Sequence, residues 1–143
     1  MAFNIQSSEF GHGAAIPTVY TCQGDDISPP ISWEGVPEGT QSLALIVHDP
    51  DVPSPDNPVR IWVHWVMYNI PHDTTKLAAH ITTADLAAGT LEGKNDWNRT
   101  GYGGPCPPLG RHRYFFKLYA CLLYTSPSPR DHSRYLVCRL LLE

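Results

Sequence analysis

The chain has 143 residues, of which 42% are hydrophobic and 17% are charged, so it is long enough for one ordinary domain and too apolar to be disordered. Its 14 prolines and 11 glycines indicate many turns and short strands rather than long helices. The net charge of −4, without a clustered run of Lys or Arg, argues against nucleic-acid binding, and no apolar run is long enough to span a bilayer.

The first half of the chain predicts strands separated by turns. We expect one strand at Ile16–Cys22, and the prolines of 28–30 lead into a second extended segment, Ile31–Trp33. Ser42–Val47 is a nearly continuous apolar run, which is typical of a strand buried on both faces. Residues 49–58 contain four prolines, so we expect a rigid loop there rather than a central strand.

The strongest strand prediction falls on Ile61–Ile70, which is rich in aromatic and β-branched residues. Because side chains alternate along a strand, Trp62 and His64 should share one face, while Trp65 and Met67 share the other. Both faces are largely apolar, so this strand should be central.

The second half of the chain is expected to contain one short helix, a long loop and a returning strand. Thr82–Ala88 has threonines that could cap a short helix. Residues 93–110 form a Gly- and Pro-rich loop, and Arg113–Ala120 returns to strand, which places His112 and Tyr114 on one face. Long irregular loops are often functional, and two aromatic-rich strands bound this one.

His64 and Asp49 are the first candidates for a binding site. Asp49 follows the buried apolar run, at the rim of the expected sheet, and His64 lies in the central strand. A carboxylate beside an imidazole favours the charged imidazole, so His64 oriented by Asp49 would suit a phosphate. A silent core histidine is the alternative for His64, and for Asp51 we favour a turn-capping role.

The loop Gly101–Pro108 is the second candidate element. Its glycines would let backbone amides converge on an anion, and its prolines would stiffen the loop. His112 and Tyr114 then add an imidazole and a phenol. An ordinary rigid surface loop is the alternative, since no Gly-Lys-Ser/Thr pattern of a phosphate-binding loop follows.

The four cysteines, Cys22, Cys106, Cys121 and Cys138, do not have the spacing of a zinc site. We favour free thiols in a reducing compartment. A bridge between Cys22 and Cys106 stays open. The first residues, Met1–Ile5, lack the basic and apolar regions of a signal peptide, so we expect a cytoplasmic location.

Several motifs together resemble the phosphatidylethanolamine-binding protein family, and in particular its bacterial and archaeal branch of Raf-kinase-inhibitor-like proteins. The resemblance covers roughly residues 5–120. It is carried by Tyr20–Cys22, Ser28–Trp33, Asp49–Pro53, Val63–Trp65 and Gly101–Tyr114.

This resemblance implies a mainly β, antiparallel sandwich with Greek-key character and a few short helices. It implies a small pocket for a phosphorylated small molecule or a phospholipid headgroup, without catalysis, metal or cofactor, and regulation of a protein partner. By motif, the pocket residues would be Asp49, Trp62, His64, Gly104, Pro105, His112 and Tyr114, with His48, Asp51 and Cys106 at the rim.

The family pattern stops after Ala120, where an acidic Leu-rich stretch, a helix and a final strand would be expected. Residues 121–143 instead resemble translated sequencing-adapter read-through. We therefore expect a family-like domain at 1–120, truncated at its C-terminus, followed by a non-native tail at 121–143.

Two other functions remain open. A hydrolase could use His64 or His112 as general base with Asp49 orienting it, and Cys106 is then the candidate nucleophile. A module that blocks a partner with its loop surface, as protease inhibitors do, is the second alternative.

Overall fold

The computed structural model describes residues 3–107, 110–125 and 134–141, which form two antiparallel sheets. Two single-turn 3₁₀ helices, η1 (Thr18–Tyr20) and η2 (Thr83–Asp85), lie outside the sheets. The small sheet has the order β1-β2-β5, with β1 (Asn4–Gln6), β2 (Ile31–Glu34) and β5 (Lys76–Leu77). The large sheet has the order β6-β4-β3-β7-β8, with β3 (Thr40–Val52), β4 (Arg60–Pro71), β6 (Leu91–Glu92), β7 (Phe115–Thr125) and β8 (Arg134–Leu141).

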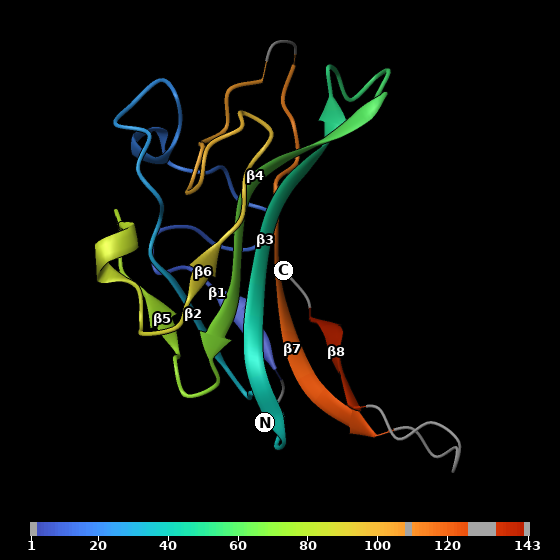
Figure 1. The fold of residues 1–143 in the computed structure, drawn as a ribbon. Helices are drawn as coiled ribbons and strands as arrows, with labels where there is room; N and C mark the ends of the chain where they lie inside the picture. Colours follow the sequence, from blue (N-terminus) through green and yellow to red (C-terminus); the bar gives the residue numbers. More distant parts are fainter. Residues whose placement is uncertain (1–2, 108–109, 126–133, 142–143) are drawn as a thin grey trace.

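The two sheets pack against each other, and Figure 1 shows the small sheet beside one face of the large one. One apolar cluster takes side chains from both: Ile31, Trp33 and Leu77 from the small sheet, and Leu43, Leu45, Val47, Trp65, Met67, Ile70, Phe116, Leu118 and Ala120 from the large one. In the large sheet, β7 returns beside β3 rather than beside β6, which is a Greek-key order. The predicted mainly β, antiparallel fold is therefore confirmed.

A β-bulge in β4 modifies the expected alternation of side chains. Val47 of β3 pairs with Trp65, but His48 pairs with Val63, so His64 is one extra residue on β4. Because Val47 and Asp49 lie two residues apart on β3, their partners Trp65 and Trp62 lie on one face. Trp65 is buried in the core, so Trp62 faces the same side of the sheet. The prediction that Trp62 and Trp65 lie on opposite faces of β4 is therefore wrong.

The long central strand β3 runs further than the prolines suggested. It continues through Asp49 and Pro50 to Val52, which pairs with Arg60, so the expected loop starts only after Val52. A register shift between Asp49 and Val52 accommodates Pro50, which cannot donate a ladder hydrogen bond.

The strand expected at Ile16–Cys22 is absent from the described residues, and η1 takes its place. The amide of Tyr20 donates to the carbonyl of Pro17 at 3.0 Å, which closes a turn that a strand could not contain. The helix expected at Thr82–Ala88 is confirmed at its start, where Asp85 accepts hydrogen bonds from the amide and hydroxyl of Thr82, but it ends after one turn.

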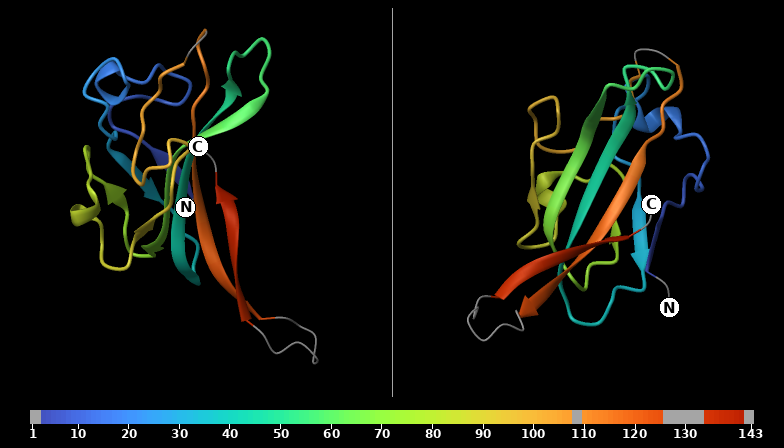
Figure 2. Two further views of the ribbon diagram at one scale, coloured as in Figure 1. Left: turned by 45° about the horizontal axis from the view of Figure 1, so that its top comes forward. Right: turned by 90° about the vertical axis from the view of Figure 1, so that its right-hand side faces the viewer.

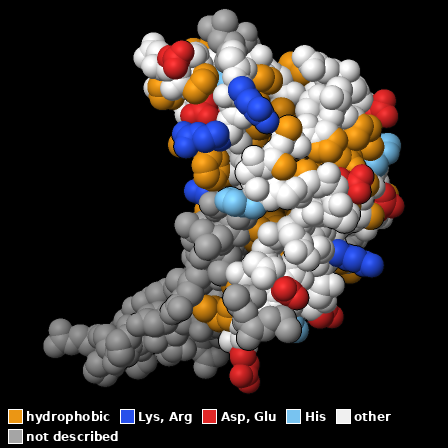
Figure 3. Space-filling view, turned by 180° about the vertical axis from the view of Figure 1, so that it is seen from behind, with side chains coloured by type: hydrophobic (Ala, Val, Ile, Leu, Met, Phe, Trp, Pro, Cys, Tyr) orange, Lys and Arg blue, Asp and Glu red, His pale blue; other side chains and the backbone are white. Residues whose placement is uncertain are grey.

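The paired strands β7 and β8 extend past the lower ends of β3 and β4 in the large sheet (Figure 2). Residues 126–133 and 142–143 of the segment expected to be non-native lie outside the described residues. Among the residues that are described, no helix is long and apolar enough to cross a membrane. Figure 3 shows acidic and basic side chains scattered between apolar areas on the rear face, without a broad area of one sign.

Candidate functional site

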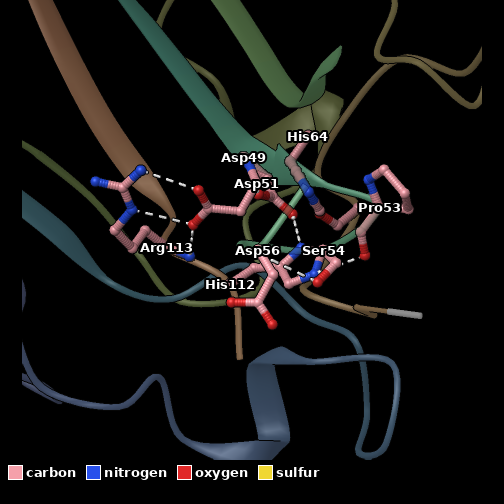
Figure 4. A network of polar contacts seen from close by, with 9 residues as sticks. Asp49, Asp51, Pro53, Ser54, Asp56, His64, His112 and Arg113 are labelled. Carbon is pink, nitrogen blue, oxygen red and sulfur yellow. Dashed lines mark hydrogen bonds and ion pairs between the residues drawn. The ribbon is translucent and has the colours of Figure 1, made fainter. Parts of the chain in front are cut away.

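Asp49, His64 and His112 come together where β3, the bulge of β4 and the approach to β7 meet (Figure 4). β3 supplies Asp49, β4 supplies Trp62 and His64, and the approach to β7 supplies His112 and Tyr114. The strand register explains this arrangement, because Asp49 pairs directly with Trp62 and the neighbouring His48 pairs with Phe115.

Asp49 holds His112 rather than His64. His112 Nδ1 lies 2.6 Å from Asp49 Oδ2, and His112 Nε2 lies 3.1 Å from the carbonyl oxygen of Pro53. With Asp49 ionised both partners are acceptors, so the ring makes both hydrogen bonds as the imidazolium. Asp49 and His112 therefore form a buried ion pair, and the expectation that Asp49 orients His64 is wrong.

His64 is oriented by the loop instead. Its Nδ1 donates to the carbonyl of Gly103 at 2.7 Å, and its own carbonyl accepts the Gly103 amide at 3.0 Å. Burial lowers the pKa of His64, against opposing contributions from the Gly103 hydrogen bond and from Asp49. A neutral ring that donates at Nδ1 presents the lone pair of Nε2.

Aromatic rings enclose His64 on two sides. Its ring lies edge-to-face with Tyr114 at 5.3 Å and with Trp97 at 5.0 Å between centroids, and Trp97 also contacts Trp62 at 5.5 Å. Sequence reasoning missed Trp97. The signal available was a tryptophan inside a loop already judged functional, but no spacing rule connects it to β4.

Two buried donors at this site have no hydrogen-bond partner among the described residues. They are Trp62 Nε1 and the hydroxyl of Tyr114. Burial raises the pKa of Tyr114, with a further contribution from the charge of Asp49, so the phenol keeps its proton. Buried polar groups are normally paired, and such exceptions need an explanation.

Gly104 and Pro105 lie in the loop, but not as an anion nest. The Gly104 amide donates to Asp26 Oδ1 at 2.8 Å, and the Gly103 amide is used by His64. The expectation that glycine amides converge on an anion is therefore wrong for these two. Gly104 is needed for close approach instead, because a Cβ there would collide with the backbone oxygen of Tyr20.

The three predicted rim residues have separate roles. Asp51 accepts three hydrogen bonds from Arg113, from the amide at 2.8 Å, Nε at 3.0 Å and Nη2 at 2.9 Å, and this guanidinium holds the pKa of Asp51 below its usual range. His48 follows Val47 onto the other face of the sheet, where it stacks on Phe115 at 5.4 Å.

Cys106 is joined to Cys22 by a disulfide with an S–S distance of 2.06 Å. The free-thiol expectation is therefore wrong for this pair, and it is also wrong for Cys121, which is disulfide-bonded as well. Within the described ranges, no group of His, Cys, Asp and Glu side chains could hold a metal ion.

Comparison with known proteins agrees with this fold, a mainly β protein built from antiparallel sheets. A sequence model described as "Phosphatidylethanolamine-binding protein" matches residues 6–137. The chain belongs to the phosphatidylethanolamine-binding protein family.

Relatives come from archaea and bacteria. A UPF0098 protein of Methanothermobacter thermautotrophicus is 50% identical over 118 residues, which cover 82% of this chain and 75% of the relative. A UPF0098 protein of Aquifex aeolicus is 47% identical over 130 residues, covering 90% and 73%.

Two solved structures resemble the chain. A family homologue from Chlamydia trachomatis has a TM-score of 0.75 at 38% identity, covering 87% of this chain and 80% of that structure. YbcL of Escherichia coli, described as a new member of the mammalian PEBP family, has a TM-score of 0.75 at 30% identity, covering 99% and 98%.

Proposed function

We propose that this protein is a non-catalytic binding protein whose pocket takes a phosphate-type anion, either a phosphorylated small molecule or a phospholipid headgroup. The ligand would lie against His64 and Tyr114, with Trp62 as a further donor and Gly104 and Pro105 forming one wall. Family membership supports ligand binding in general; the anion is inferred from the chemistry of the site.

The observation that carries this proposal is a pair of buried donors without a partner among the described residues, the hydroxyl of Tyr114 and Trp62 Nε1. Tyr114 packs against the His64 ring, and Trp62 is connected to it through Trp97. A phosphate oxygen would accept from both, which would remove the cost of leaving a buried donor unpaired. The pairing of Asp49 with an imidazolium supports the proposal as well, because a compensated carboxylate repels an anion less.

A hydrolase is the weaker proposal. It needs a nucleophile beside the His64 or His112 ring, and the candidate that the sequence offered was Cys106. That sulfur is bonded to Cys22, so it supplies no thiolate in this oxidation state.

Titration with inorganic phosphate, O-phosphorylethanolamine and a short-chain phospholipid, followed by calorimetry, tests the function and separates the two ligand sources. We expect saturable binding that is lost in His64→Ala and weakened in Tyr114→Phe, which removes only the phenol hydroxyl. His72→Ala, at an exposed histidine outside the site, is the matched control. Binding that survives in His64→Ala contradicts the assignment, and turnover of a phosphoester would favour the hydrolase.

Kinase-inhibitor-like regulation of a protein partner, and the cytoplasmic location, are further proposals of the same kind. The disulfide between Cys22 and Cys106 weighs against a strongly reducing compartment, where such bonds rarely persist. Fractionation of cells that express the tagged protein tests the location directly.

A further inference from the structure

The Cys22–Cys106 disulfide fastens the wall of the proposed pocket to a distant part of the chain. The two cysteines are 84 residues apart, and both are exposed. Cys106 directly follows Gly104 and Pro105, so the bond fixes the outer end of this wall against the segment that follows η1.

Hydrogen bonds connect the same two segments beside the disulfide. They join the Cys22 amide to the Pro105 carbonyl at 3.1 Å, the Gly104 amide to Asp26 Oδ1 at 2.8 Å and the Tyr102 hydroxyl to the Tyr20 carbonyl at 2.8 Å. Cys22 and Asp26 are exposed, so water competes for two of these three bonds. The covalent bond is the part of this attachment that water cannot replace.

The inner end of the wall is attached to the ligand-facing histidine. Gly103 exchanges two hydrogen bonds with His64, at 2.7 and 3.0 Å. Only two residues, Gly104 and Pro105, separate Gly103, which contacts His64, from Cys106. A change at the disulfide therefore reaches the proposed pocket through a short, continuous stretch of backbone.

We propose that Cys22–Cys106 is a reversible thiol–disulfide site that controls how firmly the pocket wall is held. In the oxidised protein, residues 103–106 are fixed at both ends, and the pocket is ordered before ligand arrives. In the reduced protein the outer end is released, so ordering it opposes binding. The effect on affinity rests on the proposed function; the effect on the wall does not.

The exchange needs only a dithiol as reductant. A thiolate of the dithiol attacks one exposed sulfur, the Cys22–Cys106 bond breaks, and a mixed disulfide forms. The second thiol of the reductant then displaces the protein sulfur. The dithiol is oxidised to its disulfide, and its two electrons and two protons pass to Cys22 and Cys106, which become thiols. Both cysteine residues are exposed, which gives the attacking thiolate access to the bond.

Amide hydrogen exchange tests the wall without any ligand. We expect treatment with a dithiol to speed exchange at the Gly104 amide by about tenfold or more, and less at Gly103, which His64 still holds. In the variant Cys22→Ser/Cys106→Ser, the Gly104 amide should exchange as fast as in the reduced protein. Because this variant keeps the disulfide at Cys121, that result would assign the effect to Cys22–Cys106. Cys121→Ala, which keeps the Cys22–Cys106 bond, should exchange like the oxidised protein until dithiol is added. Unchanged exchange at Gly104 in both the reduced protein and the double variant overturns the proposal.

Phosphate titration of the same four samples tests the effect on affinity. We expect binding about tenfold weaker in the reduced protein and in the double variant, with recovery on reoxidation. Equal phosphate affinity in the oxidised and reduced protein would contradict the proposal that the disulfide controls binding. If the oxidised protein does not bind phosphate, the proposed function fails, and the Gly104 exchange alone decides whether the disulfide holds the wall.

Discussion

At the scale of single residues, the most consequential arrangement is the ion pair between Asp49 and His112. Asp49 is only 2% exposed, and its two carboxylate oxygens serve different partners. Oδ1 accepts the Asp51 amide at 2.7 Å, and Oδ2 faces His112 Nδ1 at 2.6 Å. One carboxylate thus shapes the end of β3 and fixes the approach to β7.

Asp49→Asn should destabilise the protein by about 1–3 kcal/mol, because it leaves a buried imidazolium without its counter-charge. Urea denaturation followed by tryptophan fluorescence measures the loss. Asp56→Asn is the matched control, since Asp56 is exposed and its backbone amide donates to the Ser54 hydroxyl. A change at Asp49 no larger than at Asp56 would show that the pair does not stabilise the fold.

The pH dependence of anion binding follows from His64. Burial lowers its pKa in the free protein below the usual 6.5, although the carboxylates of Asp49, Asp26 and Asp96 oppose this shift. A bound anion would favour the imidazolium and raise the pKa again, so binding takes up a proton. The affinity gained in this way is fully present below the free-state pKa and is lost as the pH rises through the bound-state pKa.

A phosphodiester such as glycerophosphoethanolamine isolates this effect, because its phosphate charge does not change near neutrality. We expect affinity to fall by roughly tenfold between about pH 6 and about pH 8. His64→Gln should give a flatter profile. Calorimetry in buffers of different ionisation enthalpy should show proton uptake by the wild type alone. A flat wild-type profile would mean that His64 does not change its charge on binding.

Sequence reasoning named residues that the structure brings together, but it did not assign their partners. Trp62 and His64 both contact Trp97, although the bulge at His64 breaks the alternation that predicted their common face. Alternation does not say which imidazole meets which carboxylate, because that depends on where the loop before β7 brings His112. The amides of the glycines were misassigned for the same reason, since their acceptors lie far away in the sequence.

At the scale of elements, the bulge in β4 and the loop that follows β6 act together. The Asp96 carboxylate accepts a hydrogen bond from the Val63 amide at 2.6 Å, and the Asp96 amide donates to the Val63 carbonyl at 2.9 Å. In the same loop, the Gly103 amide donates to the His64 carbonyl, and the Gly103 carbonyl accepts from the His64 ring. The loop therefore continues the pairing of the β4 edge beyond β6. It holds the extra residue of the bulge in place and covers an otherwise unpaired edge.

Gly103→Ala should disturb this element, because a Cβ at Gly103 would collide with the ring of Trp97. We expect a loss of about 1–3 kcal/mol in the free energy of unfolding, together with weaker anion binding, as Trp97 and His64 shift. Gly11→Ala is the matched control, with nothing within 4 Å of the added Cβ. Thermal unfolding of both variants gives the comparison, and equal melting temperatures would show that the loop packs less tightly than described.

The strand predictions failed where a local rule was given too much weight. Proline was expected to end the strand before Asp49, yet β3 includes Pro50 because a register shift removes the need for its amide. Ile16–Cys22 looked like a strand from its apolar residues, but Pro17 begins the turn of η1. Ile61–Ile70 was predicted well because its aromatic and β-branched residues agree with a buried central position.

At the scale of the whole molecule, the two sheets enclose one core, but the outer face of the large sheet keeps apolar surface. Tyr68 and Leu91 are cross-strand partners at 44% and 50% exposure, and Ile61 is 58% exposed. Met67, next to Tyr68, is fully buried in the core, so Tyr68 and Leu91 face away from the small sheet.

The last prediction concerns residues 121–143, which we propose are not native to this protein. Pro127 and Pro129 in this segment suit neither a helix nor a sheet interior, and β8 pairs with β7 alone. A family-type helix and strand would instead cover apolar sheet surface. Exchanging 121–143 for the C-terminal segment of the Methanothermobacter relative should therefore raise the free energy of unfolding, measured in urea. The reciprocal exchange should destabilise the relative, and equal stability in both comparisons would contradict the proposal.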